Sequence, residues 1–169
     1  VAADTRLRGE ATPEGSIARL TQDRLRALCA PLPVEPAVSE LVDTMPERYL
    51  LGTAPERIRA HARVVAARSQ GHPAIAVFSA PSGASAEVCV VADDRPGLLA
   101  AIAAALAANR LAVLEAQIYS RVRRDGLGEA VDIFFVRVAG DAGLDEVRRY
   151  ASKAERDLAA FIDVLQQAG

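Results

Sequence analysis

The feature that most constrains the fold is a strand-like apolar run that turns directly into a helix-like one. The run Ala86–Ala92 ends at the turn Asp93–Gly97, and the alanine-rich segment Leu98–Leu106 follows at once. A strand that leads into a helix directs the first N–H groups of that helix beyond the sheet edge, where they favour a carboxylate or phosphate. Pro96 costs no hydrogen bond at a helix start, because the N–H that proline lacks would have no partner within the helix there. Gly97 has no side chain and so allows a ligand to approach the backbone. The junction predicts either an anion-binding turn or a well-formed turn without a ligand.

From residue 74 onward the apolar pattern predicts the order strand, strand, helix, strand, strand, helix. The strands are expected over 74–80, 87–92, 112–119 and 130–136, and the helices from Pro96 and over 144–167. This order favours an α+β sandwich of the ferredoxin-like kind, with a four-stranded antiparallel sheet and two helices on one face. In such a sandwich a last strand lies beside the first, and we expect the strand over 74–80 to take that place.

The opposite face of this sheet needs a cover, because an apolar sheet face is not stable in water. Three covers are considered for this face: a partner domain, a second copy of the chain, or the residues before the sheet. Residues 1–73 are expected to form a helical arm, with helices at about Pro13–Ala30, Glu35–Met45 and Pro55–Ser69 separated by prolines. Because a second copy is one way to cover the apolar sheet face, self-association is expected.

Charge and composition exclude several classes of function. A net charge of −2 and a pI near 5.7 give no electrostatic footprint for nucleic acid or an anionic membrane. No apolar run in the 169 residues is suited to crossing a bilayer. Cys29 and Cys89 lack metal-ligand spacing and are interpreted as buried residues of a reducing, cytoplasmic compartment. Because the chain begins at Val1 without a leader, we expect it to be cut from a longer protein.

No arrangement of residues typical of catalysis is found. His61 and His72 have no partner at a spacing that suggests a relay and are expected at the surface or as helix caps. Asp93 and Asp94 are expected to cap the following helix rather than bind a metal, since no second acidic or histidine cluster completes a coordination shell. Neither a metal nor a cofactor is expected. Clustered arginines are expected to form solvated faces, as in the group Arg121, Arg123 and Arg124.

The stretch VVADDRPGLLAAIAAALAANRLAVLEAQIYSR, followed by AVDIFFVRV, resembles an ACT domain, a small regulatory module that commonly binds amino acids at its strand-to-helix turn. The resemblance covers about residues 74–167 and implies an ACT domain at 74–169. Upstream, MPERYLLGTAPERIRAHARVV at 45–65 resembles the connector before the first of two ACT domains in bacterial PII uridylyltransferases. Residues 1–73 would then be the arm or linker that follows a catalytic region.

The resemblance implies a regulatory function. In that family, glutamine sensed by the ACT region shifts the enzyme from uridylylation towards deuridylylation of the PII nitrogen-signalling protein. The metal-binding motifs of its nucleotidyltransferase and hydrolase cores do not occur in these residues, so we expect a non-catalytic piece, with Mg²⁺ needed only by catalytic domains outside it. The resemblance also allows a homodimer formed through ACT domains. Two alternatives are a ligand-free dimerisation or docking module and the ACT region of another amino-acid-regulated enzyme, such as a large glutamate dehydrogenase.

Carried onto this sequence, the resemblance implies a ligand site on the turn and on the start of the next strand. The N–H groups of Gly97 to Leu99 would bind the carboxylate of an amino acid, and Asp94 or a strand carbonyl would meet its amine. Many ACT sequences carry an asparagine where this chain has Ala112, a departure that favours the ligand-free alternative. The expected ligand-binding residues are Asp93, Asp94, Arg95, Pro96, Gly97, Leu98, Leu99, Ala112 and Val113.

Overall fold

The computed structural model describes residues 35–138 and 143–168, together with Arg19 and Asp23. Most of the helix expected at Pro13–Ala30, including Cys29, lies outside the described residues. Among the described helices, none combines the length and the hydrophobicity that crossing a membrane requires.

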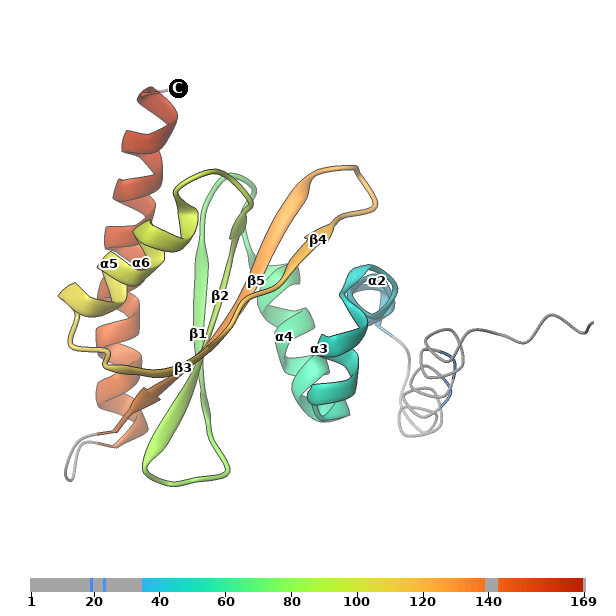
Figure 1. Cartoon of the computed structure of the whole chain (residues 1–169), viewed down its shortest axis with the longest axis horizontal. Helices are drawn as coiled ribbons and strands as arrows, with labels where there is room; N and C mark the ends of the chain where they lie inside the picture. Colours follow the sequence, from blue (N-terminus) through green and yellow to red (C-terminus); the bar gives the residue numbers. More distant parts are fainter. Residues whose placement is uncertain (1–18, 20–22, 24–34, 139–142, 169) are drawn as a thin grey trace, which may run out of the picture.

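The chain has a mixed α+β fold built on a five-stranded antiparallel sheet (Figure 1). The strand order is β1-β2-β5-β3, and β4 pairs with β5 as well. The two expected hairpins are confirmed, since β1 pairs with β2 and β4 pairs with β5. The strands are β1 (Ala74–Ser79), β2 (Ser85–Asp93), β3 (Val113–Gln117), β4 (Ser120–Val122) and β5 (Gly128–Arg137).

The expectation of a four-stranded sheet is wrong, because the strand expected over 112–119 ends at Gln117 as β3 and a separate strand, β4, follows at Ser120–Val122. The backbone N–H of Tyr119 donates to the side chain of Asp132 at 3.1 Å, whereas the carbonyl of Tyr119 accepts from Val131 N–H at 3.0 Å. A side chain thus replaces a backbone acceptor at this position and interrupts the ladder between β3 and β4. β4 is therefore a separate short strand, which pairs with β5 beyond the point where β3 ends.

Helices α5 (Leu98–Ala108) and α6 (Leu144–Gln167) cover one face of the sheet. Alternate residues of the central strands β2 and β5, such as Val88, Val90 and Phe134, point to this face and form its core. The amphipathic α6 buries one apolar stripe against them, formed by Val147, Ala151, Ala154, Leu158 and Ile162.

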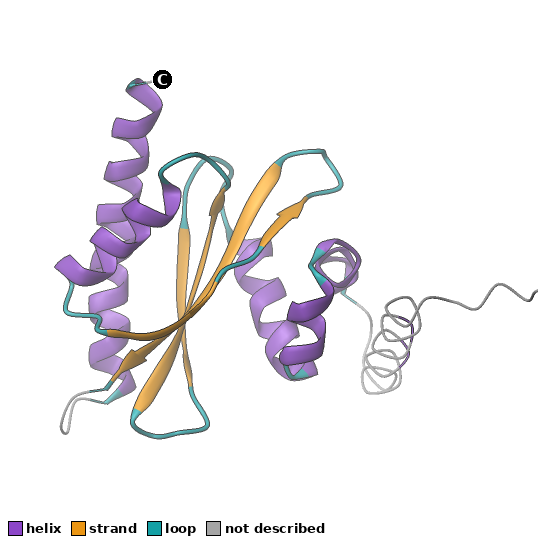
Figure 2. Cartoon of the chain, in the orientation of Figure 1, coloured by secondary structure: helices purple, strands orange, loops and turns teal. Residues whose placement is uncertain are grey.

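Helices α2 (Pro36–Thr44), α3 (Glu47–Gly52) and α4 (Pro55–Ala67) cover the other face, so that the sheet lies between two helical layers (Figure 2). A second core joins Leu41, Tyr49 and Ile58 of these helices to Cys89 and Ile133 of the sheet. Of the three covers considered, the arm is therefore the one that the structure shows. The expected helices at Glu35–Met45 and Pro55–Ser69 are confirmed with slightly shorter bounds, whereas α3 was not predicted.

Candidate ligand-binding site

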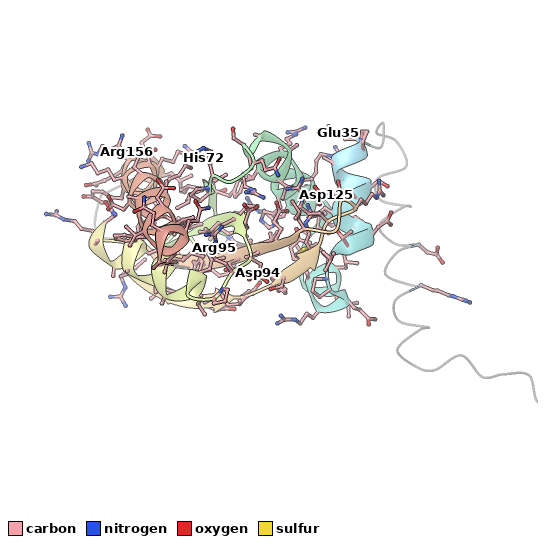
Figure 3. All side chains as sticks on the ribbon, turned by 90° about the horizontal axis from the view of Figure 1, so that it is seen from above. Glu35, His72, Asp94, Arg95, Asp125 and Arg156 are labelled. Atoms are coloured by element: carbon pink, nitrogen blue, oxygen red, sulfur yellow. The ribbon has the colours of Figure 1, made fainter. Side chains whose placement is uncertain are left out.

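A hollow of about 180 Å³ lies where β2 passes into α5, on the face of the sheet that α5 and α6 cover. The loop from β2 to α5 forms its rim, and the beginning of β5 forms its floor. Figure 3 shows Asp94 and Arg95 of this loop near each other at the surface. Six residues at 94–100 line the hollow with Ile118, Ser120, Ala130 and Asp132.

The backbone of the loop is held in one conformation by two short contacts and one glycine. Asp94 N–H donates to Gly128 O at 3.1 Å, and Leu98 N–H donates to Arg95 O at 3.2 Å. Gly97 has φ +83°, which L-residues rarely adopt, so glycine is required there. Leu98 N–H is therefore occupied, whereas Leu99 N–H at the start of α5 has no backbone acceptor within the described residues.

Arg95 contributes a second unused donor, because its Nε is buried and no acceptor lies within reach in the described part of the chain. A buried guanidinium donor without a partner is costly, and an acceptor supplied by a ligand would remove that cost. Leu99 and Arg95 both line the hollow, and each carries an N–H group without an acceptor in the described residues.

Asp132 contributes an acidic group to the floor. It is 2% exposed, and its Oδ1 accepts the Tyr119 N–H. Burial raises the pKa of this carboxyl to about 6, and the nearby negative charge of Asp94 acts in the same direction, against the lowering effect of the Tyr119 hydrogen bond. The hollow thus combines unused donors at its rim with a carboxylate at its floor.

The chain matches no protein-family model, and no curated protein is significantly similar to it. The chemistry of the site is therefore argued from its geometry.

The structure brings together most of the residues expected on the turn. Asp94, Arg95, Gly97, Leu98 and Leu99 line the hollow. Pro96, between them, is exposed on the same loop.

Three of the expected residues, Asp93, Ala112 and Val113, do not line the hollow. Asp93 faces the opposite layer, where its Oδ1 accepts from Arg68 at 2.8 Å, and no side chain caps the start of α5. The expectation that the aspartates cap this helix is therefore wrong. Val113 pairs with Val136, at the end of β5 far from Ala130 and the hollow. Within a single chain, the start of β3 does not contribute to the hollow.

Two buried polar clusters on the α2–α4 face were missed by the sequence analysis. In one, Tyr49 Oη lies 2.7 Å from His61 Nδ1, and His61 Nε2 lies 2.9 Å from Glu87 Oε2. Burial raises the pKa of Tyr49, so that its hydroxyl stays protonated, and the tautomer of His61 decides which of the two groups donates. His61 is 1% exposed, so the expectation that it lies at the surface is wrong, whereas His72 is exposed as expected.

In the second cluster, Glu129 accepts from two arginines at once. Its Oε2 lies 2.6 Å from Arg68 Nη2, and its Oε1 lies 2.7 Å from Arg121 Nη2, with all three side chains at most 2% exposed. The expectation of a solvated face at Arg121 is therefore wrong. Burial lowers the pKa of Arg68, but its hydrogen bonds to Glu129 and Asp93 outweigh this effect and raise it above the ordinary value. These clusters fasten the arm to the sheet.

No group of three or more His, Cys, Asp or Glu within the described ranges is arranged to hold a metal ion.

Proposed function

We propose that the chain is the amino-acid-sensing regulatory region of a PII uridylyltransferase and that the hollow beside α5 is its ligand site. The observation that carries the proposal is the pairing of unused donors with an acidic floor in a single small hollow. Free amino acids carry one carboxylate and one ammonium group on the same carbon. The carboxylate suits the N–H groups of Leu99 and Arg95, and the ammonium suits the acidic side of the hollow.

The architecture supports the corresponding fold assignment, a ferredoxin-like ACT domain. The sheet order β1-β2-β5-β3 and the packing of α5 and α6 on one face agree with it, if β3 and β4 together count as one strand. The resemblance of residues 45–65 to the connector of PII uridylyltransferases supports the parent enzyme and suggests glutamine as the ligand. In this proposal the arm, packed on the sheet through buried ion pairs, links ligand binding to the catalytic domains and so to the PII protein.

Glutamine binding is expected to be strongly weakened in Gly97→Val. The added side chain meets Leu165, whose Cδ2 lies 3.6 Å from a Cβ at this position, and it blocks the approach of a ligand to the backbone. Isothermal titration with glutamine is expected to show at least a tenfold weaker affinity than the wild-type chain.

Gly126→Val is the matched control, because Gly126 has φ +86° and open space around it in the β4–β5 hairpin. Both variants carry the strain of a positive φ, about 1–2 kcal/mol, but only Gly97 lines the hollow. Equal affinities of the two variants would contradict the proposed site. A wild-type chain that binds neither glutamine nor any other common amino acid would leave the ligand-free docking module as the better hypothesis.

A second copy of the chain is the proposed partner of α5 and β3. The eleven residues of α5 include no polar side chain, and the solvent side of the helix is exposed at Leu99, Ala100, Ala103, Ala104, Ala107 and Ala108. A helix that faces only water normally carries polar residues on that side. Leu114 in the edge strand β3 is also 53% exposed, so the helix and this sheet edge both expose apolar side chains.

The two edges of the sheet differ in how they are protected. At β1, Glu155 accepts from Ile75 N–H at 2.8 Å and Arg57 donates to Ser79 O at 2.8 Å, so side chains cover the backbone groups. The described residues provide no such cover along β3. Two copies related by a two-fold axis would pair their β3 strands antiparallel. In a register centred on Glu115, the partner's Val113 would lie near Gln117, one residue before the Ile118 that lines the hollow.

Leu114→Lys is expected to convert this dimer to a monomer, because it places a charge in the apolar contact. Sedimentation velocity measures the association, and Leu127→Lys is the matched control, since Leu127 is 45% exposed in the β4–β5 hairpin, away from β3. Association that is equally weakened by both substitutions would contradict the proposed interface.

A further inference from the structure

Asp132 is an unusual residue for its position. It lies in the middle of the central strand β5, and its neighbours on the same face, Ala130 and Phe134, belong to the apolar core. Directly across the ladder it pairs with Val90 of β2. A carboxylate in such surroundings costs free energy unless a partner compensates for its charge.

The described residues supply no such partner. Asp132 forms no ion pair with any arginine or lysine of the described chain, and Tyr119 N–H, a neutral donor, occupies only Oδ1. The charged groups that face it are Asp94 and Arg95 of the β2–α5 loop, since α5 carries no titratable side chain and β4 contributes Ser120. Of these, Asp94 is also negative, and Arg95 makes no hydrogen bond to Asp132.

The hydrogen bond to Tyr119 does not explain why the residue is an acid. An asparagine would accept the same bond through its amide oxygen and would remove the unpaired charge. The second carboxylate oxygen has no protein donor within the described residues, and the side chain lines the hollow. The charge is therefore best explained by a cation that arrives with the ligand.

We propose, as a step that rests on the proposed function, that Asp132 is the counter-ion of the ligand's ammonium group. The site then selects primary amines, and an acid that is otherwise identical but lacks the amine binds weakly. The role differs from that expected for Asp94, which is exposed to solvent and therefore screened. A charge-assisted hydrogen bond to a buried carboxylate is stronger and more selective than one at the surface.

A proton competes with the ligand for this carboxylate. Because the pKa of Asp132 in the empty site is about 6, only about one-tenth of the sites are ionised at pH 5, and nearly all are ionised at pH 8. A ligand that binds the ionised form lowers this pKa. Affinity is therefore expected to be about tenfold weaker at pH 5 than at pH 8, in proportion to the ionised fraction.

The test compares glutamine with glutaramic acid, which is glutamine without its α-amino group, by isothermal titration of the full chain at pH 5 and pH 8. The wild-type chain is expected to bind glutamine at least tenfold more tightly than glutaramic acid at pH 8. In Asp132→Asn both this preference and the pH dependence are expected to disappear. Asp163→Asn, at an exposed position of α6, is the control.

The outcomes separate this inference from the proposed function. If the wild-type chain binds no amino acid at either pH, both are overturned. If it binds glutamine, but Asp132→Asn keeps the preference for the amine, only the role of Asp132 is overturned. Where the variant does not fold, a wild-type affinity for glutamine that is equal at pH 5 and pH 8 overturns the role of Asp132 without it.

Discussion

Glu129→Ala is expected to destabilise the chain by about 3–5 kcal/mol, the range found when one partner is removed from a buried ion pair. The carboxylate lies between Arg68 of the arm and Arg121 of β4, and it accepts from the Nη2 atoms of both. Without it, two guanidinium groups remain at 1% side-chain exposure with only partial compensation. Asp93 would still accept from Arg68, and Glu40 would still pair with Arg121 at 3.8 Å, but these two carboxylates are partly exposed, at 27% and 30%.

Urea unfolding measures this loss, and Glu115→Ala is the matched control. Glu115 is also a strand residue, but it is exposed, and among the described residues its side chain bonds only to Gln117, so its removal is expected to cost less than about 0.5 kcal/mol. A loss below about 1 kcal/mol in Glu129→Ala would mean that solvent reaches both arginines, contrary to their burial.

Periodicity along the chain predicted those parts of the fold that depend on neighbouring residues. The amphipathic pattern of α6 and the turn residues between β4 and β5 are local signals, and both elements form where they were expected. The position of the arm on the sheet is a long-range property and was left open. One signal was present, because β2 is apolar at consecutive positions and is buried at all but its two end residues, a pattern typical of a strand covered on both faces.

The same distinction applies to the candidate site. Asp94 to Leu99 were found because they are consecutive in the sequence, whereas Asp132 reaches the hollow only through the pairing of β2 with β5. Its signal was an acid inside the apolar strand Ala130–Val136, which the sequence analysis did not use. His61 was misplaced for a similar reason. Its partners Tyr49 and Glu87 lie 12 and 26 residues away, so a lone histidine on a predicted helix gave no sign of them.

Tyr49→Ala is expected to destabilise the arm by about 3–5 kcal/mol, the range for removing a large aromatic side chain from a core. Tyr49 is completely buried in the second core, packs against Tyr119 with ring centroids 5.2 Å apart and is hydrogen-bonded to His61 at 2.7 Å. Leu51→Ala is the matched control two residues away, because Leu51 is 54% exposed. Urea unfolding is expected to separate the two variants clearly.

The reactivity of Cys89 shows whether the stability lost in Tyr49→Ala is lost at the contact between the arm and the sheet. Its thiol is completely buried beneath the arm, and burial raises its pKa, so that it reacts slowly with thiol reagents. In a Cys29→Ser background it is the only thiol of the chain. If the arm covers the sheet through Tyr49, Tyr49→Ala accelerates modification of Cys89 in native buffer, whereas Leu51→Ala does not. Equal rates in the two variants would show that the arm stays on the sheet without this anchor, and the link between ligand site and catalytic domains would then have to depend on Arg68 and Glu129 instead.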